Sequence, residues 1–377
     1  MPARTLLPLL SPGPAGVPAP APGCHCAQCP FYMDNPRAVE PVCSGTNPEC
    51  EYCSCARAEA ATEPGPRQLA CGTCPIRCGS RIDIASWMVD VGRLGFEDVR
   101  IPGRFPDALP HYIPQVDGSD IPGLDADLGW GAYAVGLRRV ISPATGRVFP
   151  KFDAVTAKAA LGLAEHQRAV LVCYSEDPLI EKIWTNRHAE ATFARVAAMG
   201  WDLVLAPNAS LYANQPRAEN LINMRRNMVM AAELAAAGVP AAAPCVYWLR
   251  LEDLDRYVDW VHAQPTLPAA IAVNLQTLRT DADWQLMVAP GLAYLAAHLP
   301  ENLPVVLTGA SRAARIAPLR ALFGPRLYLV SQNAMQYARH GALMTDAGRV
   351  DRHARVEDLF AANVRHYAHL ADPEGHH

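Results

Sequence analysis

Short apolar runs alternate with longer amphipathic segments along the second half of the chain, and polar residues follow most of the runs. The longer segments carry apolar residues three and four positions apart, which indicates helices, whereas the short runs indicate buried strands. This alternation predicts βα units on a parallel sheet. The predicted strands cover residues 169–173, 202–206, 240–246, 270–274, 304–307 and 327–330. The predicted helices cover residues 179–199, 217–237, 251–262, 281–299 and 312–323.

The segment before residue 169 is less regular. Residues 83–91 and 155–165 have helical spacing, 99–102 and 132–141 are predicted as short strands, and 111–131 as a loop. Two early strands and six later ones give about eight units, which favours an α/β fold of the (β/α)8 TIM-like barrel type over an open doubly wound sheet. We expect this barrel to span residues 81–345, with a C-terminal helix and tail over 346–377.

Ten of the twelve cysteines lie between residues 24 and 78. They form three groups, CHCAQCP, CEYCSC and CGTCPIRC, and each contains a C-x-x-C pair, with which two thiolates in a tight turn bind one metal. Residues 1–23, rich in Pro and Ala, are predicted to be a disordered tail, and residues 24–80 a Cys-rich metal-binding module. Its candidate ligands are Cys24, Cys26, Cys29, Cys43, Cys50, Cys53, Cys55, Cys71, Cys74 and Cys78.

Two kinds of metal centre fit this pattern. Proline after a C-x-x-C pair, as at Cys29-Pro30 and Cys74-Pro75, favours an iron–sulfur cluster, while the same pairs suit structural zinc. The apolar residues 6–10 are too few and too Pro-rich for a secretory signal, so we expect a cytoplasmic protein, in which disulfides are disfavoured. Cys173 and Cys245 lie in apolar runs and are predicted to be buried, inert thiols.

Net charge does not point to a nucleic-acid or membrane partner. The formal charge is −4, and no apolar run approaches the roughly 18 residues of a membrane span. Lys and Arg together number 33, of which three are Lys and thirty Arg. Arg suits bidentate contacts with phosphate or carboxylate, and a compositional bias toward Ala, Arg and Pro is the alternative explanation. Motifs for dinucleotides, for ATP phosphates and for zinc proteases are absent from the sequence.

The predicted strand ends carry many amides, hydroxyls and aromatic side chains. Asn and Gln pair a donor with an acceptor, as needed to read the edge of a nucleobase, and Tyr and Trp can stack on it. The alternative is that these residues end strands and cap the next helix. An Asn/Arg face on the helix 217–237 is predicted either as a substrate clamp or as a solvated surface. The resulting substrate-binding candidates are Asn208, Ser210, Tyr212, Arg226, Asn227, Trp248, Asn274, Gln276, Gln332 and Asn333.

Acidic residues follow the predicted strand 169–173. Glu176, Asp177 and Glu181 are the candidates for general acid–base or nucleophilic chemistry, since the start of a helix favours ionised carboxylates. The alternative for Asp177 is a helix cap, with Pro178 at the first helical position.

The run DPLIEKIW, then APNASLY, N-x-x-RRN, G-x-P and YW, resembles a family of uncharacterised proteins common in phages and other mobile elements. The resemblance covers about residues 173–277, in the same order and at similar spacing. It implies a barrel-like core and an association with mobile DNA, and it carries over no activity.

A second segment, YARHGALMTDAGRV followed by VRHYAHL, looks like the region that closes the barrel of tRNA-guanine transglycosylases. This likeness, over about residues 337–370, implies that Arg339 lies beside a base-exchange site. The chain departs from that family in two respects. The strand before this segment ends in Ser331 and lacks the nucleophilic Asp, and the clustered cysteines are N-terminal instead of C-terminal.

Three functional hypotheses follow. The first is a barrel protein directed at a nucleobase or nucleotide, for example in base modification or exchange in tRNA or DNA, with a metal-cysteine module. The second is a non-catalytic nucleic-acid-binding or assembly protein of a phage or mobile element. The third is an iron–sulfur redox enzyme. In the first two, nucleic acid or a nucleotide is the expected partner.

Overall fold

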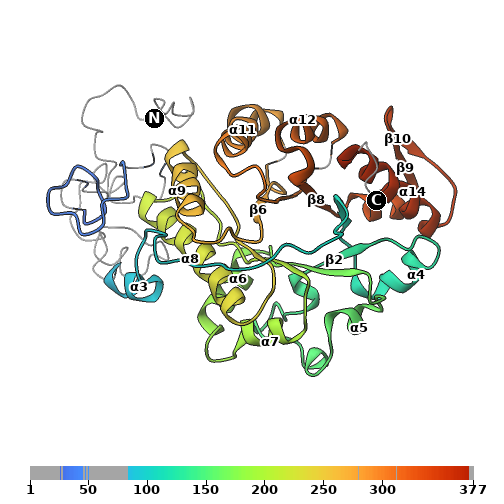
Figure 1. Cartoon of the computed structure of the whole chain (residues 1–377), viewed down its shortest axis with the longest axis horizontal. Helices are drawn as coiled ribbons and strands as arrows, with labels where there is room; N and C mark the ends of the chain where they lie inside the picture. Colours follow the sequence, from blue (N-terminus) through green and yellow to red (C-terminus); the bar gives the residue numbers. More distant parts are fainter. Residues whose placement is uncertain are drawn as a thin grey trace, which may run out of the picture. The chain divides into compact units, whose positions relative to one another are not determined.

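The computed structural model describes residues 26, 29–45, 47, 50, 84–278, 280–310 and 312–372 (Figure 1). The chain divides into two compact units. The first comprises Met1–Val99, Ala209–Val229 and Tyr247–Trp260, and the second comprises Arg100–Asn208, Met230–Val246 and Val261–His377. Within the described part of the chain, no helix is both long and apolar enough to cross a membrane.

The second unit contains eight strands in two four-stranded parallel sheets, with the orders β1-β8-β7-β6 and β2-β3-β4-β5. Most strand residues are buried, as expected for parallel strands covered on both faces. The predicted mixed α/β class with parallel sheets is therefore confirmed. The strands are β1 (Tyr112–Pro114), β2 (Ala132–Gly136), β3 (Arg168–Val172), β4 (Leu203–Leu205), β5 (Ala242–Ala243), β6 (Ile271–Asn274), β7 (Val305–Thr308) and β8 (Leu327–Ser331).

Single parallel bridges join the edges of these two sheets. Gln115 bridges to Ala134 between β1 and β2, and Cys245 bridges to Ala272 between β5 and β6. One hydrophobic cluster includes buried side chains from or next to all eight strands, such as Ile113, Val170 and Val306. Small side chains are frequent in it, which allows the strands to approach closely. Both sheets therefore contribute to one core.

Helices follow most of the strands of this unit, and a hairpin of β9 (Ala342–Thr345) and β10 (Gly348–Asp351) lies beside the C-terminal helix (Figure 1). The α-helices are α4 (Ile121–Asp125), α5 (Ala157–Leu161), α6 (Asp177–Asn186), α7 (Thr192–Ala198), α10 (Asp281–Asp283), α11 (Ala289–His298), α12 (Ala313–Phe323), α13 (Asn333–Arg339) and α14 (Val356–Ala371). A π-helical turn, η5 (Trp284–Val288), joins α10 to α11, and the 3-10 turns are η2 (Gly118–Asp120), η3 (Leu137–Arg139), η4 (Pro150–Phe152) and η6 (Gly324–Arg326).

Four expected elements differ from the structure. The predicted helix 179–199 is two helices, because Ala191 adopts a left-handed conformation (φ 47°) between α6 and α7. The predicted strand 99–102 is irregular, and β1 lies inside the expected loop 111–131. The predicted strand 240–246 is only two residues long, and Pro244, which lacks an N–H, directly follows it.

The first unit is built on three helices, α3 (Ile84–Val91), most of α8 (Arg217–Ala236) and most of α9 (Leu251–His262). The buried Arg225 of α8 donates to the carbonyls of Val91 (3.0 Å) and Gly95 (2.8 Å) and pairs with Asp98 (2.7 Å). This guanidinium fixes the end of α3 and the loop after it.

A buried ion pair joins α8 to α9 in the same unit. Arg217 contacts both Asp253 and Glu252, and Asp253 also accepts hydrogen bonds from the backbone N–H of Leu249 (2.9 Å) and Arg250 (3.0 Å). Burial alone would raise the pKa of Asp253, but the guanidinium beside it lowers that pKa below its ordinary value. The carboxylate thus caps α9 and neutralises Arg217.

Candidate functional site

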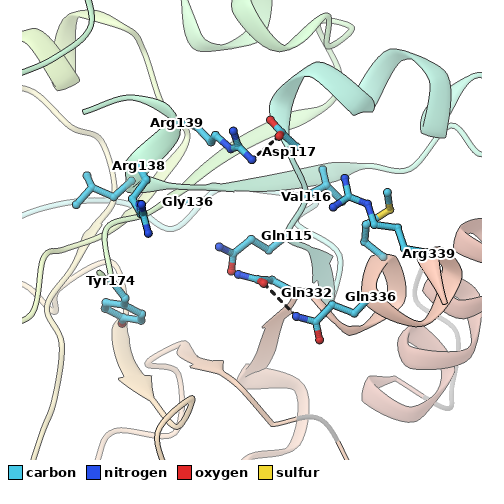
Figure 2. Close-up of a pocket in the computed structure, with 12 residues that line it drawn as sticks. Gln115, Val116, Asp117, Gly136, Arg138, Arg139, Tyr174, Gln332, Gln336 and Arg339 are labelled. Carbon is cyan, nitrogen blue, oxygen red and sulfur yellow. Dashed lines mark hydrogen bonds and ion pairs between the residues drawn. The ribbon is translucent and has the colours of Figure 1, made fainter. Parts of the chain in front are cut away.

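A cavity of about 270 Å³ lies where strands of the second unit end (Figure 2). Gln115 directly follows β1, Gly136 ends β2, Tyr174 lies two residues after β3, and Gln332 directly follows β8. Because parallel strands end at the same edge, four segments distant in sequence meet at this opening. Ligands bind at this end of the strands in α/β folds.

Gln115 and Tyr174 are the two buried side chains of the described lining that carry a polar atom without a hydrogen-bond partner. The Gln115 side chain is 7% exposed, and its Oε1 has no hydrogen-bond partner among the described residues. A Cβ atom at Gly136 would lie 3.2 Å from its Nε2, so a glycine at the end of β2 leaves room for the amide. A buried acceptor without a partner is costly. A ligand donor would satisfy this acceptor once the side chain or its neighbours shift, since the oxygen has almost no accessible surface.

Two further amides lie on the same side as Gln115. Gln336 Nε2 donates to Gln332 Oε1 at 3.3 Å, and both side chains are exposed at the opening. Figure 2 shows them beside Gln115, with Tyr174 across the space. Burial raises the pKa of Tyr174 well above its ordinary value, and the neighbouring Cys245 thiol contributes. Tyr174 is thus a neutral aromatic wall.

Exposed arginines lie at the opening, and each is paired with a carboxylate. Three arginines, Arg138, Arg139 and Arg339, and one carboxylate, Asp117, line the cavity. Arg139 pairs with Asp117, and Arg339 pairs with Asp120 at 2.6 Å. Since all three guanidiniums are more than half exposed, they can also contact an anionic group of a ligand.

Glu176 borders this site through Arg138. Glu176 Oε2 lies 3.7 Å from the Arg138 guanidinium and accepts a hydrogen bond from the Ser175 hydroxyl at 2.7 Å. The hydroxyl, with smaller help from Arg138, lowers the pKa of Glu176 below its ordinary value. Asp177 is the first residue of α6 and Glu181 lies one turn further along, and neither lines the cavity. Glu176, and not Asp177, occupies the capping position.

Two of the predicted substrate-binding residues, Gln332 and Arg339, line this cavity. Asn208, Asn274, Gln276 and Asn333 belong to the same unit but not to its lining. Asn274 accepts from Thr308 Oγ1 at 3.1 Å and thereby joins the ends of β6 and β7. Asn208 is 4% exposed, and its Oδ1 lacks a hydrogen-bond partner in the described part of the chain.

The other five predicted residues, Ser210, Tyr212, Arg226, Asn227 and Trp248, belong to the first unit. Asn227 is fully buried and binds the backbone of Ala209, accepting from its N–H at 2.6 Å and donating to its carbonyl at 3.2 Å. Asn223 likewise donates to the Ser210 carbonyl at 2.9 Å and accepts from Arg226 at 3.0 Å. In this structure the Asn/Arg face of α8 is buried and supports the corner after residue 208.

Of the ten clustered cysteines, the structure describes Cys26, Cys29, Cys43 and Cys50, and the other six lie outside the described residues. The N–H of Cys29 donates to the Cys26 carbonyl at 3.0 Å, which is the tight turn expected of a C-x-x-C pair. Cys43 returns beside this turn, since its N–H donates to the Phe31 carbonyl at 2.8 Å. Among the described residues, no group of three or more His, Cys, Asp or Glu side chains could hold a metal ion.

Buried guanidiniums surround this Cys-containing segment. Arg250 donates to Ser44 Oγ (2.9 Å) and to Asn47 Oδ1 (2.9 Å), and Asn47 donates to the Gln215 carbonyl at 2.8 Å. Burial raises the pKa of the Cys43 thiol, while the charges of Arg217 and Arg250 oppose that rise. The first unit therefore anchors the loop after Cys43 through positively charged side chains.

Gln115, Asp117, Arg138, Arg139 and Gln336 were not among the predicted site residues. The sequence predicts a loop at Gln115 and Asp117. It predicts a strand over residues 132–141, which includes Arg138 and Arg139. The available signal was the short apolar run Tyr112–Pro114 followed at once by a polar amide. No protein-family model matches this chain, and no curated protein has significant similarity to it.

Proposed function

We propose that the second unit binds a nucleobase or nucleotide in the cavity lined by Gln115, and that the protein acts on a base. The buried Oε1 of Gln115, which has no hydrogen-bond partner within the described residues, carries this proposal. A glutamine amide offers a donor beside an acceptor, which matches the paired groups on the edge of a base. Tyr174 supplies an aromatic wall, and aromatic walls favour planar rings.

The charge at the opening supports a phosphorylated ligand. Arg138, Arg139 and Arg339 outnumber the single carboxylate of the lining, and guanidiniums bind phosphate oxygens in a bidentate manner. Asp117 is the acid that could exchange a proton with a bound ring, since it lies in the lining itself. Glu176 is the second candidate, because Arg138 joins it to the opening.

We further propose that the two parallel sheets form one (β/α)8 barrel and that the N-terminal cysteines bind a metal centre. The single bridges at Gln115 and Cys245 and the shared hydrophobic cluster support the barrel. The turn Cys26–Cys29 would supply two thiolates, the remaining ligands would come from the other clustered cysteines, and iron–sulfur and zinc both fit thiolate ligands. Arg250 would offset part of the negative charge of such a thiolate site, since Arg217 is already paired with Asp253.

Calorimetric titration with the four common nucleoside monophosphates and their nucleosides tests the binding proposal. We expect one monophosphate to bind best, and its nucleoside to bind at least about tenfold more weakly, because a charge-assisted contact contributes about 1.5–3 kcal/mol. Gln115→Leu should weaken binding by a similar factor. Gln115→Glu keeps the shape but exchanges the donor for an acceptor, so it should change which base is preferred.

Gln264→Leu is the matched control, since Gln264 lies in the same unit outside the cavity lining. If wild-type protein binds none of these compounds, or if Gln264→Leu weakens binding as much as Gln115→Leu, the cavity is not a base site.

A further inference from the structure

A second cavity, of about 360 Å³, lies next to the first in the same unit. Both cavities are lined by Asp117 and Arg139, which form an ion pair. The remaining lining residues of the second cavity are mainly apolar. They include Val135 of β2, Leu161 of α5, and Val155, which lies between the turn η4 and α5. The ion pair is thus a boundary that two cavities share.

A buried donor without an acceptor lines this second cavity. Trp201 is 1% exposed, and its indole Nε1 has no hydrogen-bond partner among the residues that the structure describes. A buried N–H without an acceptor is costly, and native proteins contain few of them. Because the indole nitrogen has almost no accessible surface, a ligand with an oxygen or ring-nitrogen acceptor would satisfy this group once the cavity wall shifts to expose the N–H.

The charged groups of the second cavity favour an anion. Lys151 is exposed, and its ammonium lies 5.1 Å from the centroid of the Phe152 ring. In the described part of the chain, no carboxylate forms an ion pair with Lys151 that would compete with a ligand. Asp117, which is the one carboxylate of the lining, is already paired with Arg139. The cationic groups therefore exceed the anionic ones.

We infer that this second cavity binds a small organic anion with an apolar, ring-sized body, such as an aromatic carboxylate. Its body would pack on the valine and leucine walls, its acidic group would contact Lys151 and Arg139, and an acceptor atom would reach Trp201. The inference does not depend on the first cavity binding a base, because it rests on different side chains apart from the shared ion pair.

Ligand-observed NMR and calorimetry with benzoate test this inference on the full-length protein. Benzyl alcohol keeps the ring without the charge, and acetate keeps the charge without the ring. We expect benzoate to bind at least about tenfold more tightly than either, and Lys151→Gln to remove most of that advantage. Trp201→Phe, which keeps an aromatic ring but removes the N–H, should weaken benzoate binding.

Lys158→Gln is the matched control, because Lys158 lies on α5 but does not line the cavity. Its Nζ donates to the Glu165 carbonyl instead. Val155→Trp fills the cavity from a half-buried position and should abolish benzoate binding, with circular dichroism to verify folding. Equal binding of benzoate and benzyl alcohol, or an unchanged affinity in both Lys151→Gln and Val155→Trp, overturns the inference.

Discussion

At the scale of single residues, the amides of this chain divide into two groups. In Asn223 and Asn227 on α8, both the amide N–H and the amide oxygen form hydrogen bonds within the first unit. Gln115 instead keeps a buried acceptor without a described partner. An amide that only supports the backbone has all its partners inside the protein, so this difference separates a structural amide from one that can bind a ligand.

Asn227→Ala is expected to destabilise the protein by about 2–4 kcal/mol, because the N–H and carbonyl of the buried Ala209 would lose their partner. Urea denaturation measures this loss. Tyr212→Ala is the comparison from the same corner. Its side chain is 43% exposed, so the free energy of unfolding should change by less than about 1 kcal/mol. Similar losses in both variants would contradict a structural role specific to Asn227.

His366 on α14 is expected to make the free energy of unfolding depend on pH. Burial lowers the pKa of His366 below 6.5, with a smaller contribution from His369, while Asp346, 3.9 Å away, opposes the change. Below pH 6.5 the unfolded chain binds a proton that the folded chain resists, so stability falls as the pH decreases through that range. We expect His366→Gln to reduce this slope, by at most about 1.4 kcal/mol per pH unit. Identical slopes from urea titrations at pH 5–7 would exclude His366 as the cause.

At the scale of elements, apolar periodicity predicted the strands and helices whose burial follows one regular pattern. Strands β3, β4, β6, β7 and β8 and helix α9 lie within a residue or two of the predicted ranges. Periodicity could not reveal β1, because its three residues Tyr112–Pro114 are too few for a pattern and are flanked by turn-forming residues. Gln115 and Asp117, which follow β1, were missed for that reason, whereas Arg138 and Arg139 were missed because β2 ends at Gly136 and not at residue 141.

The break between α6 and α7 depends on one residue that periodicity also misses. Ala191 has a φ of 47°, which costs an alanine about 1–2 kcal/mol relative to a right-handed conformation. Ala191→Gly should therefore stabilise the protein by about 0.5–1 kcal/mol, after the added flexibility of the unfolded chain is subtracted. Ala194→Gly, inside α7 and also exposed, should instead destabilise by about 0.5–1 kcal/mol. Thermal unfolding of both variants checks the opposite signs.

At the scale of the whole molecule, both units bury apolar side chains. The second unit has a cluster of buried aliphatic side chains contributed by or next to eight strands. In the first unit Phe31 and Tyr32 of the Cys-containing segment are buried, and polar contacts add to this burial, from Arg250 to Ser44 and Asn47 and from Glu40 to the N–H groups of Leu94 and Gly95. The cysteine spacing predicted a metal module, but six of its ten ligand candidates lie outside the described residues, so the metal centre remains a proposal.

If the cysteines bind metal, chelation should release the Cys-containing segment and leave the parallel sheets intact. Thiolate ligands contribute much of the folding free energy of small metal modules, whereas the strands of the second unit need no metal for their core. Hydrogen–deuterium exchange, in protein purified anaerobically and then treated with a strong chelator, should show faster exchange at residues 29–45. Exchange at β3, β4 and β8 should stay slow.

Metal analysis and absorption spectra of the untreated protein distinguish iron–sulfur from zinc. Unchanged exchange at residues 29–45 after complete metal removal would contradict the metal module, because apolar burial and polar contacts alone would then hold that segment.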